Sequence, residues 1–90
     1  MLKSLEEIVK ITRDRKKIPK EGSYTNKLLS EKNLSKAKVL EEINELIEAV
    51  EKNINKTHES ADVFYHLIVY LEANNIKIED VMDELKKRRK

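Results

Sequence analysis

The chain contains no cysteine and only one glycine and one proline among its 90 residues. The absence of cysteine excludes disulfides, zinc-thiolate sites and cysteine nucleophiles, and it leaves oxygen ligands, which suit a hard cation such as Mg²⁺ or Mn²⁺. The scarcity of glycine and proline, together with 40% charged residues, is typical of a helical chain. The length predicts one small domain, residues 1–90, whose modest core favours assembly as a homodimer.

Long hydrophobic runs are also absent. No stretch is long enough to cross a bilayer and no apolar signal-peptide core follows Met1, so we expect a cytoplasmic location and no membrane partner. The chain has no glycine-rich phosphate loop and no evident Ser-His-Asp nucleophile. Its net charge is +2, and its basic runs at 13–17 and 86–90 are typical of helix ends and solvated surface. We therefore expect no nucleic-acid partner.

Apolar residues recur at helical spacing along most of the chain, which predicts an all-α fold of four or five helices. The only segment with proline and glycine, 18–23, is expected to be a loop. The predicted helices cover about 2–17, 23–31, 35–53, 56–74 and 78–88. Ser23 or Thr25 should cap the second and Ser35 the third, and Asn75 should adopt the left-handed conformation after the fourth.

Three ionisable residues, Glu59, Asp62 and His66, lie in or beside the most apolar helical stretch, 61–71. They fall within about 60° of one another on a helical wheel. Buried carboxylates without a partner are costly, so this wedge predicts a cation, most simply a metal ion. An alternative for Asp62 and His66 is a hydrogen-bonded i,i+4 pair that also contacts a neighbouring helix. Phe64, Tyr65 and Tyr70 are most simply core residues.

A second acidic pair, Glu42 and Glu45, borders the apolar arc of the preceding helix. That arc should face the core, and its residues are Val39, Leu40, Ile43, Leu46, Ile47 and Val50. If 51–56 forms a short turn, the two helices make an antiparallel hairpin on which four carboxylates converge. Such a set suits about one or two divalent ions, which indicates metal-assisted hydrolysis of a phosphoanhydride.

Three segments in order, 21–29 (EGSYTNKLL), 38–45 (KVLEEINE) and 59–69 (ESADVFYHLIV), resemble the phosphoribosyl-ATP pyrophosphatase family of histidine biosynthesis. The resemblance extends over about residues 5–89. It implies the all-α pyrophosphohydrolase fold shared with MazG-type enzymes, completed as a helical bundle by dimerisation. The implied reaction is Mg²⁺-dependent hydrolysis of the nucleotide phosphoribosyl-ATP to phosphoribosyl-AMP and pyrophosphate. A separate phosphoribosyl-AMP cyclohydrolase is an implied partner.

The resemblance also assigns residues to the site. The metal positions are Glu42, Glu45, Glu59 and Asp62. Glu41 is a fifth acid that could ligate or activate water, so the implied catalytic acids are Glu41, Glu42 and Glu45. The implied substrate contacts are Arg15, Ser23, Tyr24, Thr25, Lys38 and His66. Arg13 competes with Arg15 as the arginine of the first helix.

Some positions depart from the family pattern. Leu40 stands where the family usually has glycine, Ile43 stands where it has a small residue, and one extra residue lies between Pro19 and Gly22. The acids also resemble MazG-type enzymes, so a house-cleaning nucleoside-triphosphate pyrophosphohydrolase is the alternative function. The Gly-Ser-Tyr-Thr loop favours phosphoribosyl-ATP. A non-catalytic helical dimer is a third hypothesis.

Overall fold

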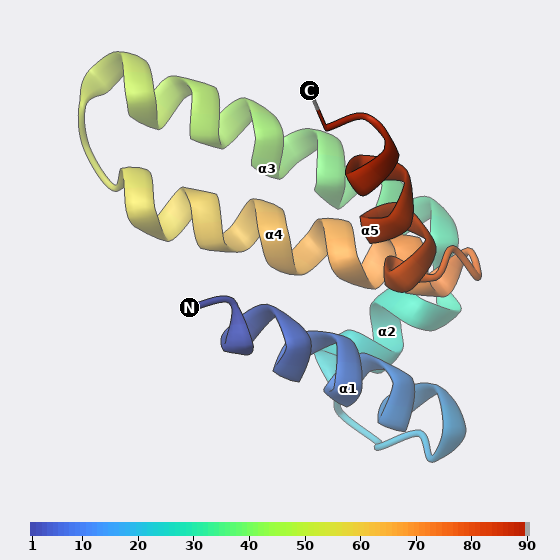
Figure 1. Ribbon diagram of the computed structural model, residues 1–90. Coiled ribbons are helices and arrows are strands. Elements are labelled where there is room, and N and C mark those ends of the chain that lie inside the picture. The colour runs from blue at the N-terminus through green and yellow to red at the C-terminus, as the bar shows by residue number, and fades with distance from the viewer. Residues whose placement is uncertain (90) are drawn as a thin grey trace.

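The computed structural model describes residues 1–89, so that Lys90, the end of the basic tail, lies outside the described residues. The helices are α1 (Lys3–Lys17), α2 (Tyr24–Ser30), α3 (Lys32–Lys52), α4 (Lys56–Ala73) and α5 (Ile78–Lys87), as Figure 1 shows. Residues 1–89 contain no strand, which confirms the predicted all-α class. Within the same range, no helix combines the length and apolar character that crossing a membrane requires.

Helices α3 and α4 form the predicted antiparallel hairpin and lie side by side (Figure 1). The turn between them depends on Asn53 and Asn55, whose φ angles are 58° and 52°. Asparagine enters this left-handed region more readily than most residues, which allows a very short connection. The tight turn therefore sets the first turns of α4 beside the end of α3.

Helices α1 and α2 pack against α4. Leu28 of α2 and Val69 of α4 are both fully buried, and Ala73 at the end of α4 is nearly so. Thr12 of α1 is also buried, and its hydroxyl donates to the carbonyl oxygen of Ile8 at 2.7 Å. Most of the small core thus lies around the second half of α4, and Ala49 of α3 is buried near the hairpin turn.

The structure settles the helix caps. Ser23, rather than Thr25, caps α2, because its Oγ accepts from the Asn26 N–H at 3.2 Å. The predicted Ser35 cap is wrong: α3 begins at Lys32, and Ser35 lies buried inside the helix. The reason is that Glu31 alone connects α2 to α3, so the third helix starts earlier than predicted. Asn75 has a φ of 59°, as predicted for the residue that reverses the chain after α4.

The apolar face of α3 is turned relative to the prediction. The most buried positions include Glu42, which is 5% exposed, while four of the six predicted core residues are exposed. These are Leu40, Ile43, Ile47 and Val50. Phe64 on α4 is 54% exposed and is not a core residue of the single chain, in contrast to the prediction. The cause is that α3 packs on α4 along one side only, so the apolar residues on its other flank stay uncovered.

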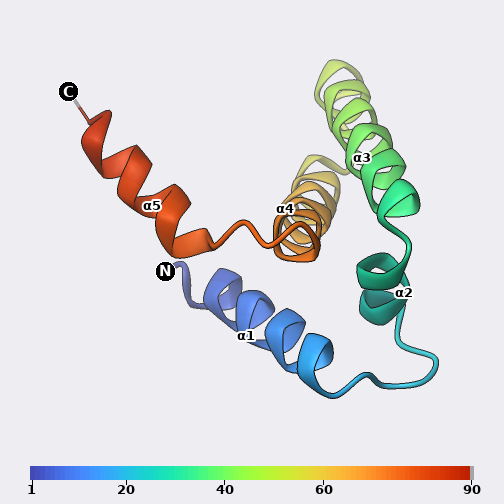
Figure 2. The ribbon, with the colours of Figure 1, turned by 90° about the vertical axis from the view of Figure 1, so that its right-hand side faces the viewer.

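An ion-pair clamp holds α1, α4 and α5 together. Arg13 of α1 binds the Glu72 carboxylate with Nε at 3.0 Å and Nη2 at 3.1 Å, and it reaches Glu79 of α5 at 2.8 and 2.6 Å. The guanidinium lowers the pKa of Glu79 to about 2. Figure 2 shows that α5 extends away from α3, and it contacts the rest of the fold chiefly at α4. The clamp is therefore the main polar anchor of α5.

We predict that Arg13→Met lowers the free energy of unfolding by about 2 kcal/mol, because it leaves the Glu72 carboxylate unpaired. The Glu72 side chain is only 6% exposed, whereas Arg13 is 35% exposed, so the effect should fall below that of a fully buried pair. Urea denaturation followed by circular dichroism measures it. Arg88→Met is the control, since Arg88 and Glu84 are both exposed, and it should leave stability unchanged. Equal effects of the two substitutions would contradict the clamp.

Candidate functional site

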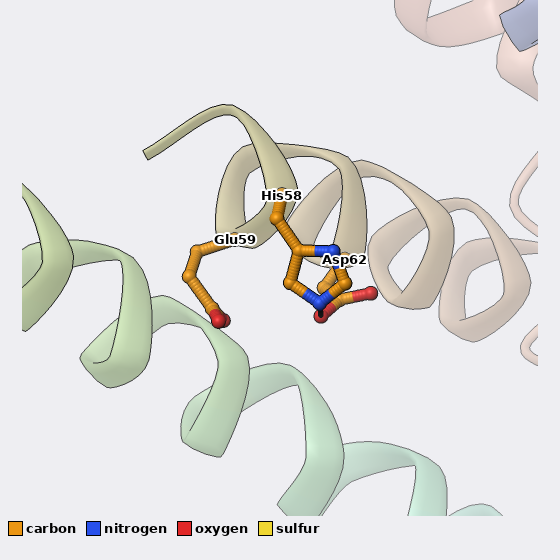
Figure 3. Close-up of side chains that lie close together, drawn as sticks. All are labelled: His58, Glu59 and Asp62. Carbon is orange, nitrogen blue, oxygen red and sulfur yellow. Dashed lines mark ion pairs between the residues drawn. The ribbon is translucent and has the colours of Figure 1, made fainter. Parts of the chain in front are cut away.

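The first acidic cluster lies at the start of α4. His58, Glu59 and Asp62 each offer a ligand atom, and these atoms all lie within 4.8 Å of one another. Figure 3 shows the three side chains directed to the same side of the helix, and the His58 Nε2 atom lies 3.5 Å from Asp62 Oδ2. His58 was not predicted. The signal was present in the sequence, because the i,i+4 spacing of His58 and Asp62 puts both on one helix face.

The second cluster is on α3. Glu41, Glu42 and Glu45 also offer ligand atoms that lie within 4.8 Å of one another. Lys38 lies one turn earlier, where its Nζ donates to Glu41 at 3.0 Å and lies 3.4 Å from Glu42. One lysine thus offsets part of the charge of three carboxylates, and the cluster keeps an excess of negative charge.

The two clusters meet across the hairpin. Glu45 of α3 and Glu59 of α4 line one cavity of about 160 Å³, together with Asn55 from the turn. The pKa of the Glu45 carboxyl is raised, chiefly by its neighbour Glu42, and burial and the negative charge of Glu59 add to the effect. The hairpin therefore places Glu45 of α3 and Glu59 of α4 at one cavity, while the ligand atoms of the two clusters form two separate groups. The convergence of all four carboxylates on one point stays a prediction.

Two carboxylate oxygens in these clusters lack partners. Glu42 Oε2 and Glu59 Oε2 are both buried and have no hydrogen-bond donor among residues 1–89. Buried polar atoms in native proteins almost always have a partner, and an unpaired buried charge is costly. A cation bound at each cluster would give these oxygens a partner. The donor set, carboxylates without thiolates, fits a hard cation such as Mg²⁺.

The loop between α1 and α2 is fastened to α1. Gly22 has a φ of +79°, a conformation that side chains disfavour, and Ser23 follows it as the cap of α2. Arg15 Nη1 donates to Ser23 Oγ at 2.7 Å, and the Asn26 side chain donates to the Arg15 carbonyl at 2.9 Å. The structure thus places Arg15 at the loop, whereas Arg13 belongs to the clamp.

The same loop is fastened to α4 beside Asp62. His66 Nδ1 lies 2.8 Å from the Asp62 carbonyl oxygen, which can only accept, so Nδ1 carries the proton. In the neutral imidazole, Nε2 then accepts from the Tyr24 hydroxyl at 3.0 Å. The alternative i,i+4 pair is thus formed with the Asp62 backbone rather than its carboxylate, which faces His58 instead. The predicted contact of His66 with a neighbouring helix is made to Tyr24 of α2.

Thr25 and Tyr24 differ in their exposure to solvent. Thr25 is buried and its Oγ1 lies 2.6 Å from the Tyr65 hydroxyl, so it positions the loop on α4. Tyr24 is 44% exposed and stacks on Tyr65 with ring centroids 6.3 Å apart. Burial raises the pKa of Tyr24, and the positive charge of Lys38 opposes that rise. Tyr24 therefore lies near enough to Lys38 of α3 to feel its charge.

Comparison with known proteins gives consistent matches. The relatives include the bifunctional histidine-biosynthesis protein HisIE of Pyrococcus furiosus, 46% identical over 100% of this chain but only 42% of that protein. The phosphoribosyl-ATP pyrophosphatase of Clostridium novyi is 45% identical, over 96% of this chain and 81% of that enzyme. The enzyme of the same name from Methanocella arvoryzae is 41% identical, over 96% of both chains.

The chain thus spans less than half of the bifunctional relative but nearly all of the Methanocella protein. A sequence model described as phosphoribosyl-ATP pyrophosphohydrolase matches residues 5–89. That match includes both acidic clusters and the loop of Ser23 and Tyr24. The chain therefore belongs to the phosphoribosyl-ATP pyrophosphohydrolase family.

Proposed function

We propose that the chain hydrolyses phosphoribosyl-ATP to phosphoribosyl-AMP and pyrophosphate in histidine biosynthesis, using Mg²⁺. Family membership supports the substrate and the reaction. The observation that carries the proposal is the pair of facing acidic clusters with buried, unpartnered oxygens on Glu42 and Glu59. Such a site suits a cation and, through it, a polyphosphate.

The acidic residues of the two clusters would bind the cation. Glu42, Glu45, Glu59 and Asp62 would hold the cation, with His58 beside them. Bound there, Mg²⁺ or Mn²⁺ would supply charge for the phosphate oxygens and acidify a water molecule.

The remaining polar groups would act on water and phosphate. Glu41 is exposed at the edge of the cluster, where it would accept a proton from the attacking water. Lys38 beside the α3 acids and Arg15 at the loop would attract phosphate oxygens.

The product of the reaction indicates which enzyme should act after this one. Phosphoribosyl-AMP must be consumed by a cyclohydrolase, and we propose a separate phosphoribosyl-AMP cyclohydrolase as a partner. The bifunctional character of the Pyrococcus relative is consistent with such a pairing. A cytoplasmic location is part of the same proposal.

We predict that Asp62→Asn and Glu59→Gln each lower kcat by at least about a hundred-fold while the helical content stays unchanged, because each removes a charged ligand but preserves shape. Pyrophosphate release at saturating Mg²⁺ measures turnover. Added Mg²⁺ should raise the Tm of the wild type and much less that of the variants. Asp83→Asn and Glu51→Gln are matched controls at exposed positions outside both clusters. Near-normal turnover of Asp62→Asn would show that Asp62 is not a ligand of the cation.

Substrate preference separates the remaining hypotheses. We predict that kcat/KM for phosphoribosyl-ATP exceeds that for ordinary or oxidised nucleoside triphosphates by at least about a hundred-fold. A site that binds the charged phosphoribosyl group discriminates strongly against nucleotides that lack this group. Parallel pyrophosphate-release assays on both kinds of substrate measure the ratio. A preference for nucleoside triphosphates would favour the MazG-type function instead. Inactivity on every substrate would favour the non-catalytic dimer.

We also propose that the chain assembles as a homodimer through the uncovered apolar face of the hairpin. On α3 this face comprises Leu40, Ile43, Ile47 and Val50, and on α4 it comprises Phe64 and Leu67. So many exposed large apolar residues on one hairpin favour an interaction surface, and a small chain gains much of its stability by covering them. Leu40 in place of the usual glycine would then pack in the interface.

Light scattering should give the mass of two 10.6 kDa chains at micromolar concentration. We predict that Ile47→Lys shifts the mass towards one chain, because it places a charge in the apolar face. Ile18→Lys is the control, since Ile18 is 79% exposed in the loop after α1 and lies outside that face. A wild-type monomer with unchanged helical content would contradict the dimer.

A further inference from the structure

A large groove lies beside the Gly22–Ser23 loop. Its volume is about 990 Å³, and its walls come from the end of α1, the loop and α2, with Ala73 at one edge. Four basic residues line it: Arg15, Lys16, Lys20 and Lys27. The acids in its wall are Glu21 and Glu31, so the lining carries a positive excess.

The four basic residues differ in how many contacts they make with the rest of the protein. Lys16 donates to the Glu72 carbonyl at 2.7 Å and to the Asn75 side chain at 3.1 Å, which gives it a structural task. Arg15 donates one N–H to Ser23 and keeps further N–H groups for a ligand. Lys20 and Lys27 have ammonium groups that form no ion pair with any residue in the range 1–89. Three cations are therefore free to bind an anion.

Hydrogen bonds through Tyr24 connect the groove to the acidic site. Tyr24 lines the groove, and its hydroxyl bonds to His66, whose ring is bonded to the backbone of Asp62. Asp62 and Ala73, which mark the two regions on α4, are separated by about 16 Å of helix at 1.5 Å per residue. The site thus offers a cation-binding region and an anion-binding region at opposite ends, with a half-exposed aromatic ring between them.

We propose that this groove binds the terminal monophosphate of the substrate's phosphoribosyl arm, through Lys20 and Lys27 with help from Arg15. The inference rests on the proposed function. Phosphoribosyl-ATP carries a triphosphate on one ribose and a monophosphate on a second ribose, with the adenine ring between them. With the triphosphate at the acidic clusters, the monophosphate extends past Tyr24 into the basic groove. An ordinary nucleoside triphosphate has no group to place there, so the groove acts as a specificity determinant.

The double substitution Lys20→Gln with Lys27→Gln tests this assignment. It removes two charges and keeps the length of the side chains, and both residues are exposed, so the fold should persist. The KM for phosphoribosyl-ATP should rise roughly ten-fold or more with kcat changed less than about two-fold, because the contact is made equally in ground and transition states. Turnover of nucleoside triphosphates should not change. Lys3→Gln with Lys10→Gln, at exposed positions on α1 outside the groove, is the matched control.

A binding experiment separates this proposal from the proposed function. Ribose 5-phosphate without added metal should shift the amide NMR signals of Gly22, Ser23 and Lys27 in the wild type, and not in the double variant. If phosphoribosyl-ATP is turned over but KM is unchanged in the double variant, the groove assignment is wrong and the function stands. A fall in kcat at constant KM also overturns the assignment. If the wild type shows no turnover, the function fails, and the titration alone decides whether the groove binds a sugar phosphate.

Discussion

The register of the α3–α4 hairpin is the constraint on which the rest of the site depends. The left-handed Asn53 and Asn55 allow a turn so short that Glu45 and Glu59 face the same cavity. A slip of one residue would rotate an acid by about 100° and carry it away from its partners. The fold thus holds like charges together in one place. The cost of doing so is evident in the raised pKa of Glu45 and the unpartnered oxygens of Glu42 and Glu59.

The second half of the site is assembled from a loop rather than from helix faces. Three contacts fix it: Arg15 to Ser23, Tyr24 to His66, and Thr25 to Tyr65. They connect α1 and α2 to α4, so the position of the loop relative to Asp62 is fixed. Glycine at position 22 permits the sharp approach to Ser23. Binding groups on a rigidly supported loop are common in enzymes, because the scaffold limits the entropy lost when substrate binds.

The hydrophobic core of the single chain is small, and polar contacts supplement it. Only Leu28, Ala49, Val69 and Ala73 are buried hydrophobic residues among 1–89. The Arg13 clamp anchors α5, and the uncovered apolar side of α3 leaves surface for a second copy of the chain. The same geometry explains why the predicted core positions Leu40 and Phe64 are exposed. They lie on the exposed surface of the single chain, and in the proposed dimer they would lie in the interface.

The sequence by itself determined the helices, the loop at 18–23, the hairpin and the identity of the acids, because periodicity, breakers and i,i+3 spacing are local properties. The resemblance of the 21–29, 38–45 and 59–69 segments determined the family. Tertiary structure decided which side of α3 is buried. Apolar residues cover a wider part of the surface of α3 than the one helix packed against it, α4, can bury.

Tertiary structure also decided several pairings that spacing could not. Arg13 binds Glu72 and Glu79, and Arg15 contacts Ser23 of the loop, whereas the sequence alone left Arg13 as a competitor of Arg15. The partner of the His66 ring comes from a helix forty-two residues earlier in the chain. The Ser35 cap failed because Glu31 alone separates α2 from α3, so that α3 begins at Lys32. Such choices depend on contacts between distant segments, which a local pattern does not specify.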